Sequence, residues 1–416
     1  MERYDSYKDS GVKWLGEIPS HWEVVPMKYY TNIIMGQSPD GSQVKDSGTT
    51  LFMQGNAEFG SKTPSPTLYC DNCKKHSRVG DILMSVRAPV GATNISDKVY
   101  GIGRGLCSIR ANSVSRNYLW YYLKVCQLGF KELSKGSTFE SVSVDDIKSL
   151  TLLMPHAIEQ DAIADYLNDI VSRIDSVISQ QQKMIDLLNE RKQIIINNAV
   201  TKGLNPNASM KDSAIDWIGQ IPSQWDIKRG KFLFRIVNDL SKTGEEELLS
   251  VSDKTGVTPR SMKNVNMFMA ESLVGYKKCK VGDICSNIMW MWHGAVGVSK
   301  YEGVISPSYG VYRQIGRYYH NDYLDLMLRL PRIVKLYSVL STGLTESRLR
   351  LYPSDFLGIY FMVPPIEEQK KIVEYVRNMC NPIDSAIDNI EKQISLLQER
   401  KQIIINDVVT GKVKVV

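Results

Sequence analysis

The stretch Leu187–Thr201 reads LLNERKQIIINNAVT, and it returns near the C-terminus as Leu396–Thr410, LLQERKQIIINDVVT. Twelve of the fifteen positions are identical, and the two copies lie 209 residues apart. Similarity at a fixed distance is the sign of a duplicated structural unit. We therefore expect the chain to contain one long element twice.

Apolar residues run into both copies with alternating steps of four and three residues. This spacing of 3.5 residues per turn predicts two long helices that pack on each other as a coiled coil. The predicted seam consists of Ile174, Ile178, Gln181, Ile185, Leu188, Lys192 and Ile195 in the first copy, and of Ile383, Ile387, Ile390, Ile394, Leu397, Lys401 and Ile404 in the second.

Two further motifs are also duplicated. The entry KDSGVKWLGEIPSHWEVVPMK (Lys8–Lys28) matches KDSAIDWIGQIPSQWDIKRGK (Lys211–Lys231), and MPHAIEQ (Met154–Gln160) matches VPPIEEQ (Val363–Gln369). Proline just before an acidic start is typical of a helix N-terminus. Asn381 before Pro382 predicts that the second long helix begins afresh there.

The segments between these repeats diverge in sequence and favour irregular β structure. The turn Val-Gly-Asp occurs in both, at Val79–Asp81 and Val281–Asp283, and each is followed by a short apolar run. The glycines of GIGRG (Gly101–Gly105) predict a tight turn between strands, since they lack the GxGxxG spacing of a nucleotide loop. Strands are expected within 79–90, 102–109, 150–154, 281–291, 304–313 and 358–363, and helices at 116–128 and 321–336.

Composition is that of an ordinary folded protein of more than one domain, with 416 residues, 43% hydrophobic and 23% charged. Seven scattered cysteines, a polar N-terminus and no long apolar run indicate a cytoplasmic protein without disulfides or a membrane span. The net charge is +6, but residues 24–150 carry +5 and residues 227–359 carry +7. The basic surplus lies in the two divergent segments, which fits a polyanionic partner or simply two slightly basic domains.

Motifs for catalysis or cofactor binding are not apparent. Cys70-Asp-Asn-Cys73 with His76 has the spacing of half a zinc site, but a second pair is missing, so no metal is expected. The histidines show no pattern for nucleophilic catalysis, and no phosphate-binding P-loop occurs. We expect neither enzymatic activity nor a cofactor.

Polar clusters in the divergent segments are the candidates for DNA contact. Arginine can grip guanine with two hydrogen bonds, and Ser, Thr and Lys suit phosphates. The alternative for any one of them is a solvated loop, and the tryptophans are expected to fill a core rather than to touch DNA. The candidates are Ser85, Arg87, Arg104, Lys135, Ser137 and Thr138 in the first segment, and Trp292, His293, Ser306, Tyr309, Ser347, Arg348 and Arg350 in the second.

The charged triplets Glu190-Arg191-Lys192 and Glu399-Arg400-Lys401 stand inside the repeated helices. They indicate either a solvated flank of the coiled coil or a docking surface for a partner subunit.

These duplicated motifs together resemble the specificity (S) subunit of type I restriction-modification enzymes, over essentially the whole chain. The resemblance rests on WLGEIPSHW/WIGQIPSQW, the two P…EQ starts and LLNERKQIII/LLQERKQIII, in the same order in both halves. GDILMSVRAPVG (Gly80–Gly91) with IGRGL (Ile102–Leu106) is similar to one class of target-recognition domain. WMWHGAVGVS (Trp290–Ser299) with ISPSYGVYR (Ile305–Arg313) is similar to another.

The resemblance implies an α+β fold with two β-rich target-recognition domains, joined by two long helices packed as an antiparallel coiled coil, with a pseudo-twofold internal repeat. It implies target-recognition domains at 1–153 and 205–362 and helical spacers at 154–204 and 363–416. The family reads a bipartite, asymmetric DNA site and docks two methyltransferase subunits and restriction subunits, and its specificity subunit is not catalytic. A helix over about 174–200 would be roughly 40 Å long, which compares with ~34 Å for a turn of B-DNA.

Two other interpretations of the sequence stay open. A non-catalytic coiled-coil scaffold with two protein-binding domains explains the repeats but not the basic charge of the divergent segments. An enzyme hidden in one divergent segment needs a carboxylate cluster or a cofactor loop, and the sequence shows neither.

Overall fold

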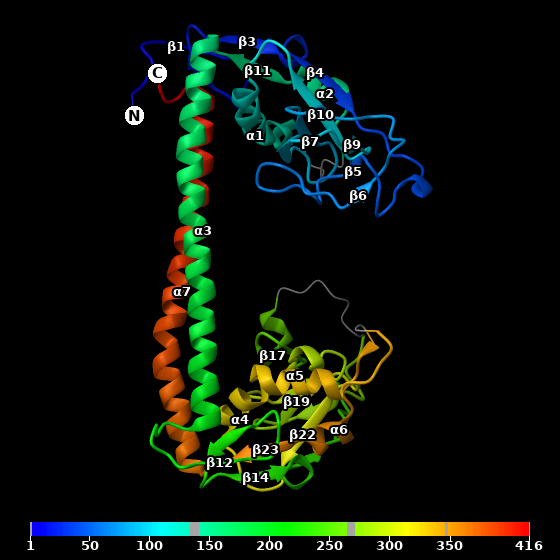
Figure 1. Ribbon diagram of the computed structural model, residues 1–416, viewed down its shortest axis with the longest axis vertical. Helices are drawn as coiled ribbons and strands as arrows, with labels where there is room; N and C mark the ends of the chain where they lie inside the picture. The colour runs from blue at the N-terminus through cyan, green and yellow to red at the C-terminus, as the bar shows by residue number, and fades with distance from the viewer. Residues whose placement is uncertain (1, 134–140, 264–270, 346–347, 416) are drawn as a thin grey trace. The chain divides into compact units, whose positions relative to one another are not determined.

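The computed structural model of the chain describes residues 2–133, 141–263, 271–345 and 348–415, without the side chains of 127–133. The chain divides into two compact units (Figure 1). Unit 1 is Met1–Gln182 with Glu391–Val416, and unit 2 is Lys183–Ile390. Each unit therefore contains one end of each repeated helix and one divergent segment.

The repeated stretches form parts of two long helices, α3 (Ala157–Lys202) and α7 (Ile366–Val409). In unit 1, Asp175 of α3 lies 2.6 Å from Lys401 of α7, and Gln181 hydrogen-bonds Gln393 at 2.9 Å. Residue numbers rise along one helix while they fall along the other, so the two helices pack antiparallel. In unit 2, Lys192 of α3 contacts Asp384 of α7.

The helical periodicity read from the sequence is confirmed at the seam. Ile174, Ile185 and Ile404 are buried, and Ile178 and Leu397 pack against the unit 1 core. Burial of these side chains supplies the main stabilisation of the pair, at about 25 cal/mol per Å² of apolar surface.

Both helices are continuous, which corrects the predicted new start at Pro382. Proline inside a helix removes the hydrogen bond to the carbonyl four residues earlier. That carbonyl belongs to Asn378, whose residue is exposed, so water can replace the lost donor. Val376 and Cys380 pack into the unit 2 core just before the proline and hold the helix in place.

The repeated entry motif forms a β-hairpin at the start of each half of the chain. Trp22 and Trp225 follow the hairpins and are fully buried. Each indole packs against a glycine that follows one of the long helices. A Cβ on Gly203, after α3, would lie 3.4 Å from Trp225, and a Cβ on Gly411, after α7, would lie 3.1 Å from Trp22. The paired strands are β1 (Tyr7–Asp9) with β2 (Glu17–Pro19), and β12 (Met210–Asp212) with β13 (Gln220–Pro222).

The divergent segments share one sheet topology despite their different sequences. Each contains a four-stranded antiparallel sheet whose strands follow the same order. The order is β4 (Thr31–Met35), β10 (Leu106–Ala111), β7 (Ile82–Ser85), β8 (Thr93–Ile95) in unit 1, and β15 (Phe234–Ile236), β22 (Gly310–Gln314), β19 (Ile284–Ser286), β20 (Val296–Val298) in unit 2.

Smaller strands complete each unit. A two-stranded ladder joins the start of each divergent segment to its end: β3 (Glu23–Pro26) with β11 (Thr151–Met154), and β14 (Asp226–Arg229) with β23 (Tyr360–Val363). Unit 1 adds β6 (Leu68–Tyr69), β5 (Leu51–Met53) and β9 (Gly101–Ile102), whereas unit 2 adds β16 (Leu249–Ser252) with β17 (Gly256–Pro259) and β18 (Lys277–Cys279) with β21 (Gly303–Ile305).

Short helices cover these sheets. The helix expected over 321–336 is two helices, because Pro331 ends one and begins the next. The helices are α1 (Arg116–Leu133), α2 (Val144–Ser149), α4 (Asn321–Leu328), α5 (Pro331–Leu340) and α6 (Pro353–Gly358), with 3-10 turns η1 (Met27–Tyr29), η2 (Gly41–Gln43), η3 (Gly230–Phe232), η4 (Arg260–Met262) and η5 (Met291–His293). Within the described parts of the chain, no helix has the length and apolar character needed to cross a membrane.

Candidate nucleic-acid interface

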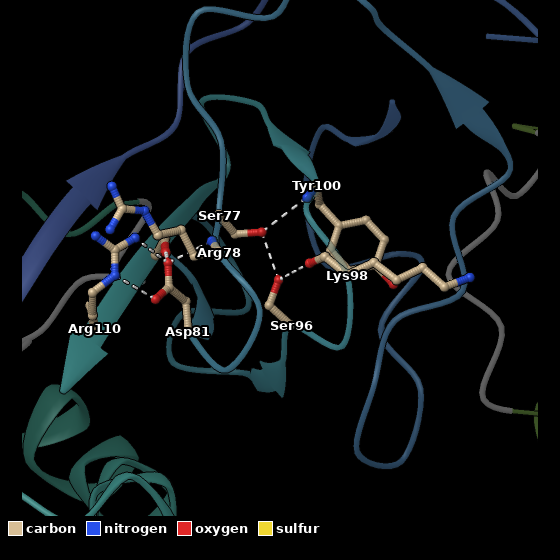
Figure 2. A network of polar contacts seen from close by, with 8 residues as sticks. Ser77, Arg78, Asp81, Ser96, Lys98, Tyr100 and Arg110 are labelled. Atoms are coloured by element: carbon tan, nitrogen blue, oxygen red, sulfur yellow. Dashed lines mark hydrogen bonds and ion pairs between the residues drawn. The ribbon is translucent and has the colours of Figure 1, made fainter. Parts of the chain in front are cut away.

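A buried aspartate anchors the central strand of the unit 1 sheet (Figure 2). Asp81 follows Gly80, which has a positive φ of 88°, and it accepts two hydrogen bonds of 2.8 Å from Arg110 and one of 2.6 Å from Ser108. Burial alone would raise the pKa of Asp81, but the hydrogen bonds from Arg110, Ser108 and the amide of Arg78 outweigh it and lower the pKa. Arg110 is thereby committed to the framework and is not available to a ligand.

Unit 2 contains the same anchor. Asp283 follows Gly282, which has a φ of 92°, and Arg313 donates two hydrogen bonds of 2.7 Å to its carboxylate. The repeated Val-Gly-Asp turn was visible in the sequence, but the arginine partners lie some thirty positions later and carry no local signal. The anchor fixes the strand that leads into the candidate loop of each unit.

The loop after β7 presents Arg87 at the surface of unit 1. Arg87 is exposed, and its backbone forms an isolated antiparallel β-bridge with Ser141. The amide of the neighbouring Val86 donates a hydrogen bond to the carbonyl of Gly105. Arg104 is exposed on the turn between β9 and β10, as the GIGRG pattern predicts. Among the described residues, neither Arg87 nor Arg104 has an ion-pair partner.

Ser85 does not belong to this surface. It is buried, its hydroxyl donates to the carbonyl of Pro89 at 2.6 Å, and it accepts from the amide of Ala92 at 3.0 Å. This corrects the expectation of a DNA contact, because the hydroxyl is already used to shape the loop that carries Arg87. Lys135, Ser137 and Thr138 lie outside the described residues.

Unit 2 places aromatic rings at the equivalent loop, after β19. Trp290 is 55% exposed, and its ring stacks on Trp292 with centroids 5.8 Å apart and planes 18° apart. His293 packs edge-on against both rings, and its Nδ1 lies 3.2 Å from Asp253. The indole N–H of Trp292 donates to the carbonyl of Met289 at 3.0 Å. Trp290 is therefore an exposed aromatic surface, and the prediction that this tryptophan fills a core is wrong.

A second basic segment lies beside this aromatic loop. The amide of Leu351 donates to the carbonyl of Ile288 at 3.1 Å, which brings the residues before Leu351 next to the loop. Arg348 is exposed and Arg350 is half-buried, with a guanidinium N–H donating to the carbonyl of Leu349. Ser347 lies outside the described residues.

Ser306 and Tyr309 form the turn before β22, and Tyr309 contacts the loop after β19 through Asn287. The hydroxyl of Tyr309 accepts a hydrogen bond of 2.9 Å from Asn287, and its carbonyl accepts one of 2.7 Å from Lys277. Ser306 is half-buried and its carbonyl accepts from the amide of Tyr309. Both residues hold the turn before β22, where Tyr309 is half-buried.

The charged triplets of the repeated helices divide into two roles. Lys192 contacts Asp384 within unit 2, and Lys401 lies 2.6 Å from Asp175 within unit 1. Both lysines thus join α3 to α7, as their predicted places in the seam indicate. The remaining members Glu190, Arg191, Glu399 and Arg400 are exposed.

The cysteines provide no metal site in the described chain. All seven are free and buried, and no cluster of three or more His, Cys, Asp or Glu suited to a metal occurs among the described residues. Cys70 and Cys73 pack with Phe52 in a small apolar cluster. Burial and the neighbouring Cys70 raise the pKa of the Cys73 thiol to about 12, so at neutral pH it is a protonated, uncharged side chain.

Comparison with known proteins identifies the family. The family model of the type I restriction modification DNA specificity domain matches twice, at residues 19–186 and 222–396. A protein of Methanocaldococcus jannaschii assigned as the MjaX type I restriction enzyme specificity subunit is 37% identical over 203 residues, or 48% of this chain and 46% of that protein. The match therefore spans about half the length of that relative.

Two further matches cover more of the chain. The MjaVIII specificity subunit of the same organism is 25% identical over 317 residues, or 72% of this chain and 70% of that protein. A chain from a solved structure on complex assembly and conformational transition of the type I R-M system is 15% identical, with a TM-score of 0.65, and covers 95% of this chain and 99% of that one. It shows the same fold. Because the family model covers well over half of the sequence, the chain belongs to the type I restriction-modification DNA specificity family.

Proposed function

We propose that this chain is the DNA-reading subunit of a type I restriction-modification complex, and that each unit reads one half of a bipartite, asymmetric site. The observation that carries the proposal is a shared framework with different exposed loops. The same aspartate–arginine anchor positions Arg87 in unit 1 and Trp290 in unit 2. A duplicated scaffold with unlike readers suits two unlike half-sites.

The readers we propose differ in chemistry. In unit 1, Arg87 and Arg104 supply free guanidinium groups, which suit guanine edges or phosphates. In unit 2, Trp290 and Trp292 form an apolar tip beside Arg348, and His293 packs edge-on against both rings. An apolar tip suits the methyl group of thymine, because stacked duplex bases expose their edges and not their faces. The proposed recognition domains cover residues 1–153 and 205–362.

Methyltransferase subunits dock, in this proposal, on the outer face of the repeated helices. Leu187 and Ile194 in unit 2 are 60% and 52% exposed, and their counterparts Leu396 and Ile403 in unit 1 are 63% and 52% exposed. Packing of α3 on α7 does not require these apolar side chains. Because Glu190-Arg191 and Glu399-Arg400 share this face, one partner surface would fit both copies, which favours two identical subunits.

Catalysis is left to these partners and to restriction subunits that join the complex. The described residues hold no cluster of His, Cys, Asp or Glu suited to a metal, and the anchoring carboxylates are bound to arginines. The test is to express the chain with its cognate methyltransferase subunit and map the methylated bases of the host DNA. The expected result is one bipartite sequence with an unread gap. Methylation by the chain alone, or methylation without sequence preference, would contradict the proposal.

A further inference from the structure

A lysine on α1 of unit 1 lacks the partner that its burial calls for. The Nζ of Lys124 lies 3.8 Å from the ring centroid of Trp120, one helical turn earlier, and 5.8 Å from that of Tyr121. Among the described residues Lys124 has neither a hydrogen-bond acceptor nor an ion pair within 4 Å, although the carboxylate of Asp175 acts on it from farther away. An aromatic face attracts a cation but accepts none of its three N–H donors fully. The ammonium is thus partly desolvated and still able to donate.

Its surroundings are positively charged. Lys62, from the loop between β5 and β6, places its Nζ 5.7 Å from the same Trp120 ring. Lys401 of α7 is close enough to act on Lys124, but it is already paired with Asp175 of α3. The carboxylate of Asp175 is therefore shared between Lys401 and Lys124. The indole N–H of Trp120 is also buried without an acceptor among the described residues.

Equivalent caps align α1 with α4 of unit 2. The amide of Ser115 donates to Gln160 and the amide of His320 donates to Gln369, both at 2.8 Å, immediately before the two helices begin. Counting from these caps, Trp120 corresponds to Asp325 and Lys124 corresponds to Arg329.

In unit 2 that cation is satisfied internally. Arg329 lies 3.8 Å from the carboxylate of Asp325 and donates 2.6 Å hydrogen bonds to the carbonyls of Asp253 and Lys254. Unit 1 keeps a cation at the same place but replaces the carboxylate by an indole. Arg329 uses its N–H groups to hold the fold of unit 2. Lys124 makes no such contact with the described residues, so its N–H groups are unused there.

We propose that Lys124, backed by Trp120 and flanked by Lys62, is a phosphate-binding site for the DNA backbone at the half-site that unit 1 reads. The inference rests on the proposed function. A phosphodiester oxygen would accept from the free ammonium, and its charge would balance the surplus of the cluster. The contact positions the duplex without reading bases, because phosphate is common to every sequence. It is confined to unit 1.

The salt dependence of DNA binding tests this site. The complex of the full chain with its methyltransferase subunit is titrated with a duplex containing the mapped target, between 50 and 200 mM salt. Each phosphate contact contributes about 0.9 to the slope of log affinity against log salt. Lys124→Gln should reduce the magnitude of this negative slope by about 0.9, so that the loss of affinity between 50 and 200 mM salt becomes about threefold smaller. Lys124→Arg should keep the wild-type slope.

Arg329→Gln is the matched control. It should lower the melting temperature of the complex and leave the salt slope unchanged, because Arg329 serves the fold. Lys124→Gln should instead reduce the salt slope and leave the melting temperature unchanged or higher. If Lys124→Gln leaves the slope unchanged, or melts the protein as Arg329→Gln does, the phosphate site is refuted.

A scan with single methylphosphonates separates a DNA site from a site for an acidic protein partner. Neutralising one phosphate of the first half-site should weaken wild-type binding and leave the Lys124→Gln complex unaffected. If Lys124→Gln instead weakens assembly with the methyltransferase subunit, the cluster serves that subunit and the inference is wrong. A wild-type complex that does not select the mapped target would refute the proposed function itself, which is a different result.

Discussion

Asp81 and Asp283 hold equivalent arginines, so their effect on stability is open to direct measurement. Asp81→Asn would leave the Arg110 cation beside a neutral amide in a buried site. Loss of one partner of a buried pair costs about 3 kcal/mol. We expect chemical denaturation of the chain to show a loss of that size for unit 1, whereas Asp40→Asn, at an exposed loop residue, should change stability by less than about 0.5 kcal/mol. Equal effects of the two changes would contradict the anchor.

The pH dependence of this anchor follows from the direction of the pKa shift. Hydrogen bonds hold the pKa of Asp81 in the folded protein below its ordinary value of 3.8. The unfolded chain then binds a proton more readily than the folded chain, so the stabilisation is present above pH 4 and is lost as the pH falls through the folded pKa. Asp81→Asn should remove this acid-sensitive part of the stability.

Lys124 also makes the folded protein more stable as the pH rises, but it does so in the alkaline range. Burial, and then Lys401, lower its pKa to about 8, while Asp175 opposes this and Lys62 adds to it. Protonated Lys124 therefore destabilises the folded protein below pH 8, and the effect fades toward the unfolded pKa of about 10.5. If the proposed phosphate contact is made, DNA affinity should fall as the pH rises through 8, and Lys124→Arg should not show this fall.

Trp290 offers a test of base reading by a single methyl group. Replacing thymine by deoxyuridine removes that methyl and leaves the hydrogen-bonding edge intact. At one position of the second half-site this replacement should lower the affinity of the wild-type complex about fourfold, since a buried methyl contributes about 0.8 kcal/mol. Trp290→Ala should bind both duplexes equally. A full deoxyuridine penalty in Trp290→Ala would show that another group touches the methyl.

At the scale of elements, the repeated helices carry two faces with separate tasks. Leu187→Ala with Ile194→Ala should reduce the number of methyltransferase subunits bound from two to one, because the copy at Leu396 and Ile403 remains. Mass measurement of the purified complex gives this number directly. The inward change Ile185→Ala should instead destabilise the chain by about 2–5 kcal/mol. Retention of both subunits by the outward variant would refute the docking face.

The sequence predicted the periodic elements well and the irregular ones poorly. The seam residues Ile174 and Ile404 are buried as the helical spacing indicated, because a regular period reports the face that packs. Pro382 gave a wrong helix boundary, since packing on either side outweighs one missing hydrogen bond. Ser85 was expected at the surface and is buried, whereas Trp290 was expected in a core and is exposed. Short loops have no period from which burial could be inferred.

At the scale of the whole molecule, each long helix continues from one unit into the other. If this pair sets the unread gap, insertion of one heptad into both α3 and α7 should lengthen the gap in the methylated sequence and leave both half-sites unchanged. A heptad preserves the seam, so folding should be retained. A gap of unchanged length would contradict a spacer role.

The central claim is that each divergent segment reads one half-site on a common framework. The most direct measurement replaces residues 227–359 by a second copy of residues 24–150 and maps the bases that the resulting complex methylates. The account predicts a symmetric target, in which the half-site of the first segment appears twice as inverted copies. Methylation of the original asymmetric sequence by this variant would contradict the account.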